Sequence, residues 1–282
     1  MVDLISVAIL TRNGGEVFAS VLDALEHQEI DVPYEIVLLD SKSSDGTVRR
    51  ARKAGARIHQ IHPEDFSFGK SRDELFGYCE GDIIATLSQD ARPLTTSWLD
   101  DLTAPIRSGS ADISQGVERL TDKPFFWERV GKFYSTSEWL PFLEEYGYPG
   151  LSTVNLASSR EAWKKTGFGP IPMCSDKLFQ KRAAQAELKT TRCDEAVVQH
   201  GHVYSTASLV KRCANEGLAL RHLGVRVELP KTLRDLAYLD NYRTLLRGLL
   251  QGEINQTSEV LFPILRPVAA WYGNHFLAER WR

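Results

Sequence analysis

The sequence lacks the features that mark several classes of protein. Its four cysteines are widely spaced and form no Cys-x-x-Cys pair: Cys79, Cys174, Cys193 and Cys213. This argues against a zinc site or a disulfide framework and predicts reduced thiols. No apolar run approaches the roughly 20 residues that cross a bilayer. The N-terminus has neither a basic region nor a long apolar region, so we expect no secretory signal and a soluble, cytoplasmic protein.

The sequence also lacks a strong excess of positive or negative charge. The formal net charge of the 282 residues is only −3, and the apolar, charged and aromatic fractions are ordinary for a globular protein. Composition therefore gives no reason to expect nucleic acid as a partner. The length suits one large domain or two small ones with a substantial core.

The first half alternates between apolar runs and amphipathic stretches. Strands are expected at 4–10, 34–40, 56–61 and 82–88, with helices between them at 16–26, 47–54 and 70–78. This order predicts an α/β fold with a mostly parallel, doubly wound central sheet flanked by helices. Ligands of such sheets bind at the carboxyl ends of the strands, where Thr11, Asp40 and Asp90 lie.

The second half is less regular. Short strands are expected at 111–117, 154–158, 188–192 and 196–200, and helices at 160–165 and 176–186. Residues 121–148 are rich in aromatic side chains and are expected to be helix and loop. From Lys231 onward the pattern is helical and apolar, which predicts a helical C-terminal extension.

Two segments in the first half could bind a nucleotide. Asp40 follows an apolar strand, so its carboxylate could accept hydrogen bonds from a nucleobase or a ribose, or could simply stabilise a turn. Lys70 and Arg72 lie at the start of a helix after Gly69, where N–H groups and cations bind phosphate. The alternative for these two cations is a solvated basic turn.

Asp90, His200 and His202 are candidate metal ligands. Asp90 ends an apolar strand, and a single carboxylate there suits Mg²⁺ or Mn²⁺, which takes further ligands from water and substrate phosphates. His200 and His202 follow a strand and alternate, so both face one side and could approach a metal or a diphosphate. Many strands end in aspartate, and a lone histidine is more often structural.

Asp176 begins a helix after Ser175. A carboxylate here could be the general base that deprotonates an acceptor hydroxyl. A first-turn acid favoured by the helix dipole is a common alternative, and one residue could serve both purposes.

These motifs occur in an order that resembles family 2 glycosyltransferases, specifically the bacterial rhamnosyltransferase-like branch. The matching segments are Val7–Gly15, Leu39–Thr47, Phe66–Arg72, Leu87–Ala91 and His200–Ser205. Together they span roughly residues 4 to 215, and the combination is far more specific than any single motif.

The resemblance implies a GT-A-type, Rossmann-like fold, a nucleotide-diphosphate sugar donor, a divalent metal (Mg²⁺ or Mn²⁺) and inversion at the anomeric carbon. The expected donor is dTDP-rhamnose, or another dTDP- or UDP-sugar, and the expected acceptor is a glycan or a lipid-linked glycan in cell-surface polysaccharide or O-antigen assembly. A catalytic domain is expected at 1–228, with a donor half at 1–118, an acceptor half at 119–228 and the helical extension at 229–282.

The resemblance also assigns roles by position. It implies Asp176 as the catalytic base and Asp90, with His200 and His202, at the metal. The nucleotide-sugar site would comprise Thr11, Arg12, Asn13, Asp40, Lys70, Arg72 and Gln89. The chain departs from the family pattern twice: Ser88-Gln89-Asp90 replaces Asp-x-Asp, and Ser175 replaces the glutamate before the base.

Two other functions are compatible with the sequence. A non-catalytic nucleotide-sugar-binding or scaffold protein would explain the two departures. A sugar-phosphate nucleotidyltransferase would need a glycine-rich basic loop that Thr11–Gly15 does not match. The aromatic segment 261–282 is expected to be either a membrane-surface anchor at the inner face of the cytoplasmic membrane, or a helix packed on the catalytic domain or on a second copy of the chain.

Overall fold

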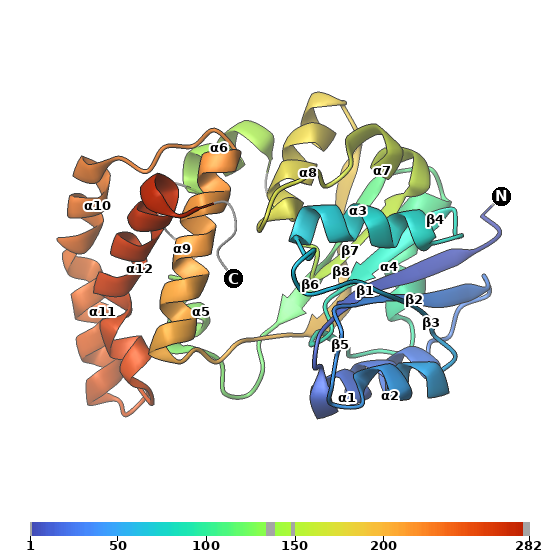
Figure 1. Ribbon diagram of the computed structural model, residues 1–282, viewed down its shortest axis with the longest axis horizontal. Coiled ribbons are helices and arrows are strands. Elements are labelled where there is room, and N and C mark those ends of the chain that lie inside the picture. Colours follow the sequence, from blue (N-terminus) through green and yellow to red (C-terminus); the bar gives the residue numbers. More distant parts are fainter. Residues whose placement is uncertain (1, 134–138, 148–149, 279–282) are drawn as a thin grey trace. The chain divides into compact units, whose positions relative to one another are not determined.

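The computed structural model describes residues 2–133, 139–147 and 150–278. The chain forms two compact units, drawn in Figure 1. The first unit contains Met1–Arg119, Pro149–Pro170 and Ser175–His200, and the second contains Leu120–Tyr148, Ile171–Cys174 and Gly201–Arg282. The predicted functional division at residues 118 and 228 stays a prediction.

The first unit is built on one sheet, whose eight described strands have the order β3-β2-β1-β4-β7-β6-β8-β5. Strands β1 to β4 are mutually parallel, β6 and β8 are parallel to each other, and β7 and β5 run antiparallel to their neighbours. The predicted α/β class with a mostly parallel sheet is confirmed. The strands are β1 (Ile5–Thr11), β2 (Tyr34–Asp40), β3 (Arg57–Gln60), β4 (Ile83–Leu87), β5 (Arg92–Pro93), β6 (Ile113–Arg119), β7 (Asn155–Ser159) and β8 (Thr190–Gln199).

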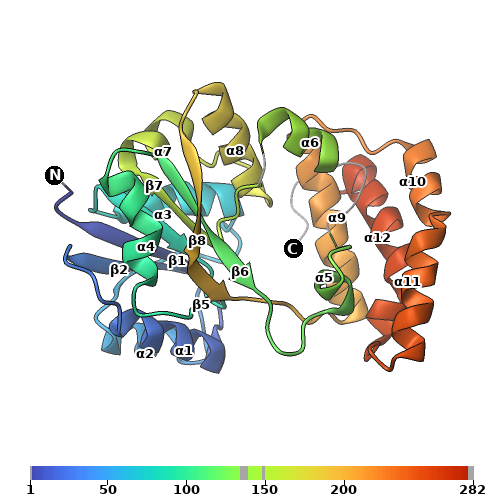
Figure 2. The same cartoon turned by 180° about the vertical axis from the view of Figure 1, so that it is seen from behind.

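Helices cover both faces of this sheet because the side chains of its central strand alternate. Ile5, Val7 and Ile9 pack in one core with residues of α1 (Gly15–Glu26), α2 (Thr47–Lys53) and α4 (Trp98–Arg107). Ala8 points into a second core with residues of α3 (Phe68–Tyr78), α7 (Arg160–Thr166) and α8 (Ser175–Gln185). In Figure 1, α3, α7 and α8 lie on the side of the sheet that faces the viewer. In Figure 2, the view from behind, α4 lies on the side that faces the viewer.

Four elements differ from the sequence expectation. Helices α4 and α9 (Thr206–His222) and the two-residue strand β5 were not predicted, and one strand, β8, replaces the two short strands expected at 188–192 and 196–200. Helix α4 carries Pro105 inside it, and α9 buries the charged Glu216. Proline and a buried charge both blur the periodic apolar pattern that marks a helix.

The second unit is helical in its described part. It contains α5 (Phe126–Arg129), α6 (Trp139–Tyr146), α9, α10 (Leu229–Leu236), α11 (Leu239–Leu250) and α12 (Thr257–Phe276). Its core joins α9 and α12 with the aromatic residues Phe125, Trp127 and Phe262. The buried Arg266 of α12 forms an ion pair with Glu216 of α9 at 2.8 Å, so a charged pair lies inside this helix contact.

Helices α9 and α12 approach so closely that two glycines are required. A Cβ atom on Gly217 would lie 1.9 Å from the carbonyl oxygen of Ala270, and one on Gly273 would lie 1.8 Å from that of Ala214. Both obstacles are backbone atoms of a neighbouring helix, which cannot rotate away as a side chain could. The glycines therefore set the separation of the two helices.

We predict that Gly217→Ala destabilises the protein by about 3 kcal/mol or more, because the added methyl group forces the helices apart. The matched control is Gly77→Ala in α3, where a Cβ meets nothing within 4 Å. That change should be neutral or stabilising by about 0.5–1 kcal/mol. Urea unfolding followed by circular dichroism compares the two, and equal transition midpoints would show that the close approach does not govern stability.

Candidate active site

Thr11 and Asp40 lie side by side at the carboxyl ends of β1 and β2, where they are paired in register. Asp40 is completely buried, and the Thr11 hydroxyl donates a hydrogen bond to its Oδ1 atom at 3.0 Å. The backbone N–H and hydroxyl of Ser43 and the side chain of Gln60 also donate to this carboxylate. Four donors nearly saturate a carboxylate, which has about four acceptor positions. A nucleobase would have to replace one of them.

Arg12, Asn13 and Gln89 belong to the loops that follow β1 and β4. The backbone N–H of Arg12 donates to Oε1 of Gln89 at 2.9 Å, and Nε2 of Gln89 donates to the Arg12 carbonyl at 3.3 Å. Asn13 has a positive φ of 48°, and its side-chain oxygen accepts a hydrogen bond from the backbone N–H of Ser44. Gln89 thus connects two of the loops predicted to surround the donor, and the Arg12 side chain is exposed.

The two cations of α3 have different surroundings. Lys70 is exposed, whereas Arg72 is buried with 7% of its surface accessible. Nη1 of Arg72 donates to the Ser175 hydroxyl at 2.6 Å, and its guanidinium lies over the Phe168 ring. Burial lowers the pKa of Arg72 to about 10, while the charges of Asp176 and Asp73 act in the opposite direction.

Asp176 lies in the first turn of α8, directly after Ser175. Its side chain is 20% exposed, and Nζ of Lys177 lies 3.4 Å from its Oδ2 atom. Ser175 is buried and accepts the hydrogen bond from Arg72. The residue that replaces the family's expected glutamate is therefore engaged by a buried cation, and this contact ties α3 to the start of α8.

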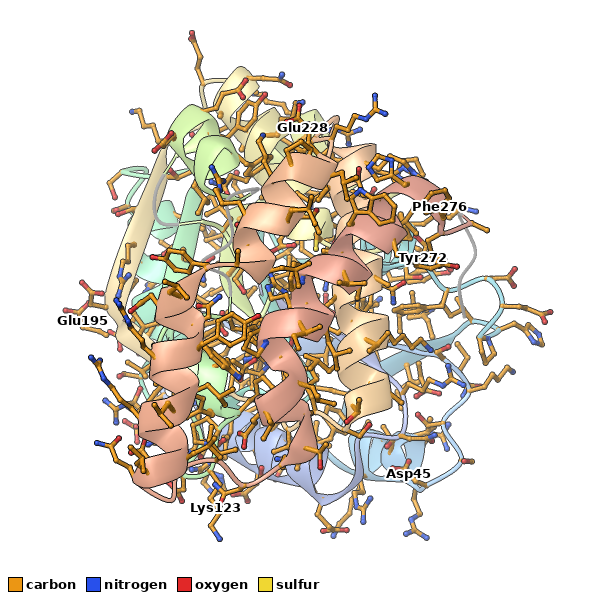
Figure 3. The ribbon with its side chains drawn as sticks, turned by 90° about the vertical axis from the view of Figure 1, so that its left-hand side faces the viewer. Asp45, Lys123, Glu195, Glu228, Tyr272 and Phe276 are labelled. Atoms are coloured by element: carbon orange, nitrogen blue, oxygen red, sulfur yellow. The ribbon has the colours of Figure 1, made fainter. Side chains whose placement is uncertain are left out.

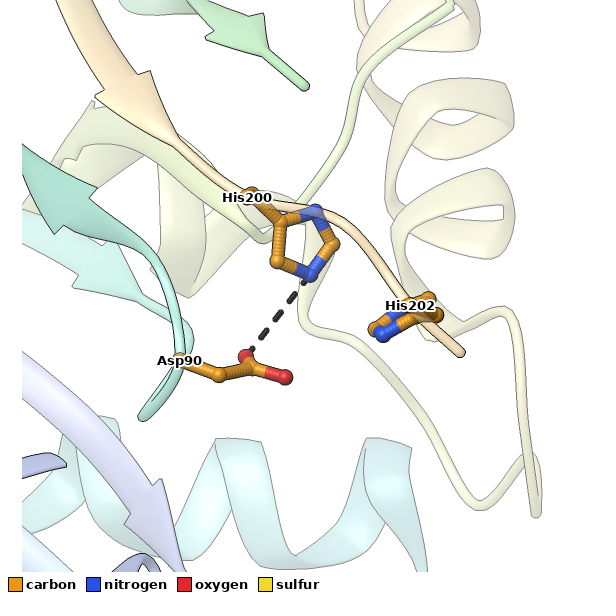
Figure 4. A group of neighbouring side chains, drawn as sticks. All are labelled: Asp90, His200 and His202. Atoms are coloured by element: carbon orange, nitrogen blue, oxygen red, sulfur yellow. Dashed lines mark ion pairs between the residues drawn. The ribbon is translucent and has the colours of Figure 1, made fainter. Parts of the chain in front are cut away.

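Asp90 and His200 meet at the carboxyl ends of β4 and β8, as Figure 4 shows. Nε2 of His200 lies 3.7 Å from Oδ1 of Asp90. His202 follows two residues later, where the first unit passes into the second. One ligand atom each of Asp90, His200 and His202 lies within 4.8 Å of the others. The side chain of Asp90 is 40% exposed and that of His200 is 9% exposed.

Glu118, near the end of β6, is a site residue that the sequence reasoning missed. Its Oε2 atom lies 3.0 Å from Nδ1 of His200, and its Oε1 atom accepts a hydrogen bond from the Ser152 hydroxyl. Burial raises the pKa of Glu118, but the hydrogen bond and charge of His200 outweigh it and hold that pKa below the ordinary value. The signal was present: the strand was expected to end at Val117, so Glu118 lies at an expected strand end, as Asp40 and Asp90 do.

The sequence model described as "Glycosyl transferase family 2" matches residues 6–163, more than half of the chain. The chain belongs to glycosyl transferase family 2. The matched region contains Thr11, Asp40, Asp90 and Glu118, and it ends before Asp176 and His200.

Two relatives agree with the rhamnosyltransferase-like branch of this family. The glycosyltransferase is 25% identical over 231 residues to the O-antigen chain rhamnosyltransferase RfbN of Salmonella typhimurium, a match that covers 76% of the chain and 71% of RfbN. It is 23% identical over 201 residues to the O-antigen chain rhamnosyltransferase WbaN of Salmonella anatum, covering 68% of the chain and 64% of WbaN.

Solved structures with a similar fold include a mannosyltransferase and a synthase. One is mannosyltransferase PcManGT from Pyrobaculum calidifontis in complex with GDP-Man and Mn²⁺, with a TM-score of 0.64, 14% identity and coverage of 98% of the chain and 87% of that protein. The other is glucosyl-3-phosphoglycerate synthase from Mycobacterium tuberculosis with Mn²⁺, UDP and glucosyl-3-phosphoglycerate, with a TM-score of 0.62, 20% identity and 78% coverage of both chains. The predicted GT-A-type fold is confirmed.

The donor atoms of the glycosyltransferase's Asp90, His200 and His202 fit a divalent metal. One carboxylate oxygen and two imidazole nitrogens can surround one ion and leave positions for water or phosphate oxygens. Glu118 contacts Nδ1 of His200, the ring nitrogen that does not face Asp90. Carboxylates orient metal-binding histidines in this way.

We predict that Glu118→Gln weakens Mn²⁺ binding by about 10- to 100-fold, because the neutral amide holds the His200 ring less firmly in the orientation that binds the metal. Titration calorimetry with Mn²⁺ alone measures the affinity. Glu195→Gln is the matched control, since Glu195 is an exposed carboxylate of β8 close in sequence to His200. Equal Mn²⁺ affinity of Glu118→Gln and the unmodified protein would exclude this role.

Proposed function

We propose that this glycosyltransferase transfers rhamnose, with inversion, from a nucleotide-diphosphate donor to a hydroxyl group of a glycan or lipid-linked acceptor in cell-surface O-antigen assembly. The observation that carries this proposal is the contact of Asp90 with His200 at the carboxyl ends of β4 and β8, in a chain of this family. The names of the relatives RfbN and WbaN support rhamnose and the O-antigen. We propose a cytoplasmic location for the enzyme and dTDP-rhamnose as its donor.

The donor is proposed to bind at the carboxyl ends of β1, β2 and β4. Asp40 and Thr11 would hold the nucleoside, with Gln89 fixing the surrounding loop through the Arg12 backbone. Arg12 and Asn13, directly after β1, and Lys70, in the first turn of α3, supply exposed polar groups for this proposed site. Arg72 is buried against Ser175, so its proposed contribution is to hold α8 beside the donor site.

The proposed reaction is a single displacement. Asp176 accepts the proton of the acceptor hydroxyl while that oxygen forms a bond to C1 of the sugar, and the bond from C1 to the diphosphate oxygen breaks. Nζ of Lys177 lies 3.4 Å from Oδ2 of Asp176 and places a positive charge beside the proposed base. Both substrates are held in one site, which replaces an unfavourable encounter in solution.

Asp90, His200 and His202 are proposed to hold the divalent metal. When bound, such a metal supplies positive charge that offsets the charge of the departing diphosphate. Glu118 keeps His200 in place through its Nδ1 atom, independently of the substrates.

The test is hydrolysis and binding of a panel of dTDP-, UDP- and GDP-sugars in the presence of Mn²⁺, Mg²⁺ or EDTA. Metal-dependent binding and turnover of one donor, with dTDP-rhamnose preferred, is the expected result. Preference for another sugar would correct the donor and leave transferase activity in place. Binding without turnover, also in the presence of glycan acceptors, would favour a scaffold protein.

A further inference from the structure

The second unit has an unusual surface. Most of the large apolar side chains that are exposed in the described chain lie on or beside α10, α11 and α12, the helices that face the viewer in Figure 3. Helix α12 contributes a row of exposed apolar residues at every fourth position: Val260, Ile264, Val268, Tyr272 and Phe276. Residues four apart lie on one face of a helix, so this row is a continuous stripe.

Helix α11 has two distinct apolar sides. Its inner side is defined by contacts: Gly248 is buried against Phe126, and Leu245 packs on the core that contains Phe125 and Phe262. Its outer stripe, defined here as Leu239, Tyr242, Leu246, Leu249 and Leu250, is between 37% and 80% exposed. At 100° per residue this stripe is centred almost opposite Gly248. The core therefore accounts for one side of α11 and leaves the outer stripe in solvent.

Helix α10, which packs against α12, also has exposed apolar residues. Leu229 and Leu233, one helical turn apart, are 50% and 56% exposed. A soluble protein seldom leaves so many large apolar side chains in one region uncovered, and such regions usually mark an interaction surface. We therefore expect the surface of α10, α11 and α12 to bind a partner that buries its apolar side chains.

The charges around this surface indicate the kind of partner. Arg243 and Arg247 are exposed and flank the outer stripe of α11 on one side, one residue after Tyr242 and Leu246. Residues 226–250 carry five Lys or Arg and three Asp or Glu, although the whole chain has a formal charge of −3. One of the three acids, Asp240, is paired with Lys132 of the same unit. The surface is locally positive on a negative protein.

We propose that the outer face of α10, α11 and α12 binds the surface of an anionic lipid membrane. Apolar side chains bordered by arginine are the pattern of helices that lie in the headgroup region. In the described part of the chain no helix is long and apolar enough to cross a bilayer. In a two-fold contact with a second copy this surface would meet itself, so its arginines would face a surface of their own sign. This inference goes beyond sugar transfer and does not depend on it.

The experiment is co-sedimentation of the full chain with vesicles of phosphatidylglycerol and phosphatidylcholine in equal amounts, and with vesicles of phosphatidylcholine alone. The variants are Leu246→Glu and the double change Arg243→Gln, Arg247→Gln. Val17→Glu is the matched control, because Val17 of α1 is 54% exposed and Leu246 is 57% exposed. Circular dichroism confirms that each variant is folded, and no sugar nucleotide is needed.

The unmodified protein is expected to sediment with the anionic vesicles at least about tenfold more than with phosphatidylcholine, since each cation near an anionic surface strengthens binding by roughly fivefold. Leu246→Glu should reduce binding about tenfold, and Val17→Glu should not. Absence of vesicle binding, or equal binding by both glutamate variants, would overturn the proposal. The proposal would also be overturned if the protein did not bind vesicles but formed a dimer that Leu246→Glu dissociates. A protein that binds vesicles but transfers no sugar would contradict only the proposed function.

Discussion

Replacing Asp176 with asparagine is expected to lower kcat for sugar transfer by about 100- to 10,000-fold, the contribution of a positioned general base. The amide has nearly the same size and keeps its place in the first turn of α8, so the buried contact of Ser175 with Arg72 should persist. Donor affinity should stay unchanged, because a base acts on the acceptor. Steady-state kinetics with donor and acceptor, together with donor binding by calorimetry, measure the two quantities separately.

Asp194→Asn is the control for this experiment. Asp194 is an exposed carboxylate of β8 whose described ion pair is with Arg192, and its loss should leave both kcat and donor affinity intact. If Asp176→Asn retained more than about a third of kcat, Asp176 would be a helix-stabilising acid and the base would have to be sought elsewhere.

Replacing Asp90 with asparagine is expected to lower the rate of transfer by about a thousandfold. A metal that stabilises the charge of a leaving diphosphate contributes several kcal/mol, and about 4 kcal/mol corresponds to this factor. The neutral amide is a poor ligand compared with a carboxylate, and it leaves His200 and His202 to hold the ion alone. Unlike Asp176→Asn, this variant should also lose the Mn²⁺ dependence of donor binding.

The control is Asp31→Asn, an exposed aspartate just before β2, at the opposite edge of the sheet from the strand ends that carry Asp40 and Asp90. Calorimetry of donor binding with Mn²⁺ and with EDTA provides the readout. Donor binding by Asp90→Asn that still responds to Mn²⁺ as in the unmodified protein would place the metal on other residues.

Local sequence pattern determined the first half of the fold. The apolar runs that became β1, β2 and β4 are short, continuous and separated by amphipathic helices, which is sufficient to specify a parallel sheet. Because parallel strands end at one edge, the position of Thr11 beside Asp40 followed from the sequence without coordinates. The same rule, applied one strand further, would have included Glu118.

The contacts across long stretches of chain were decided by tertiary structure alone. Glu118 meets His200 across 82 residues, and Arg72 meets Ser175 across 103 residues. Arg72 lies three residues before Leu75 and four before Phe76, so it is on the buried face of α3. Its charge nevertheless suggested solvent or phosphate, because a guanidinium is rarely buried without a partner that only the folded chain supplies.

The helical second unit shows the same division. Its C-terminal helices were expected from the apolar pattern that begins near Lys231. In α11, however, the apolar residues lie on two sides of the helix. Hydropathy reports that a residue is apolar and not which of two sides the core will cover. The contacts of Gly248 with Phe126 and of Leu245 with the aromatic core decided that choice, because they join α11 to segments distant in sequence. Local burial periodicity therefore determined the elements and the strand-end residues, and the packing of distant segments decided which of those residues meet.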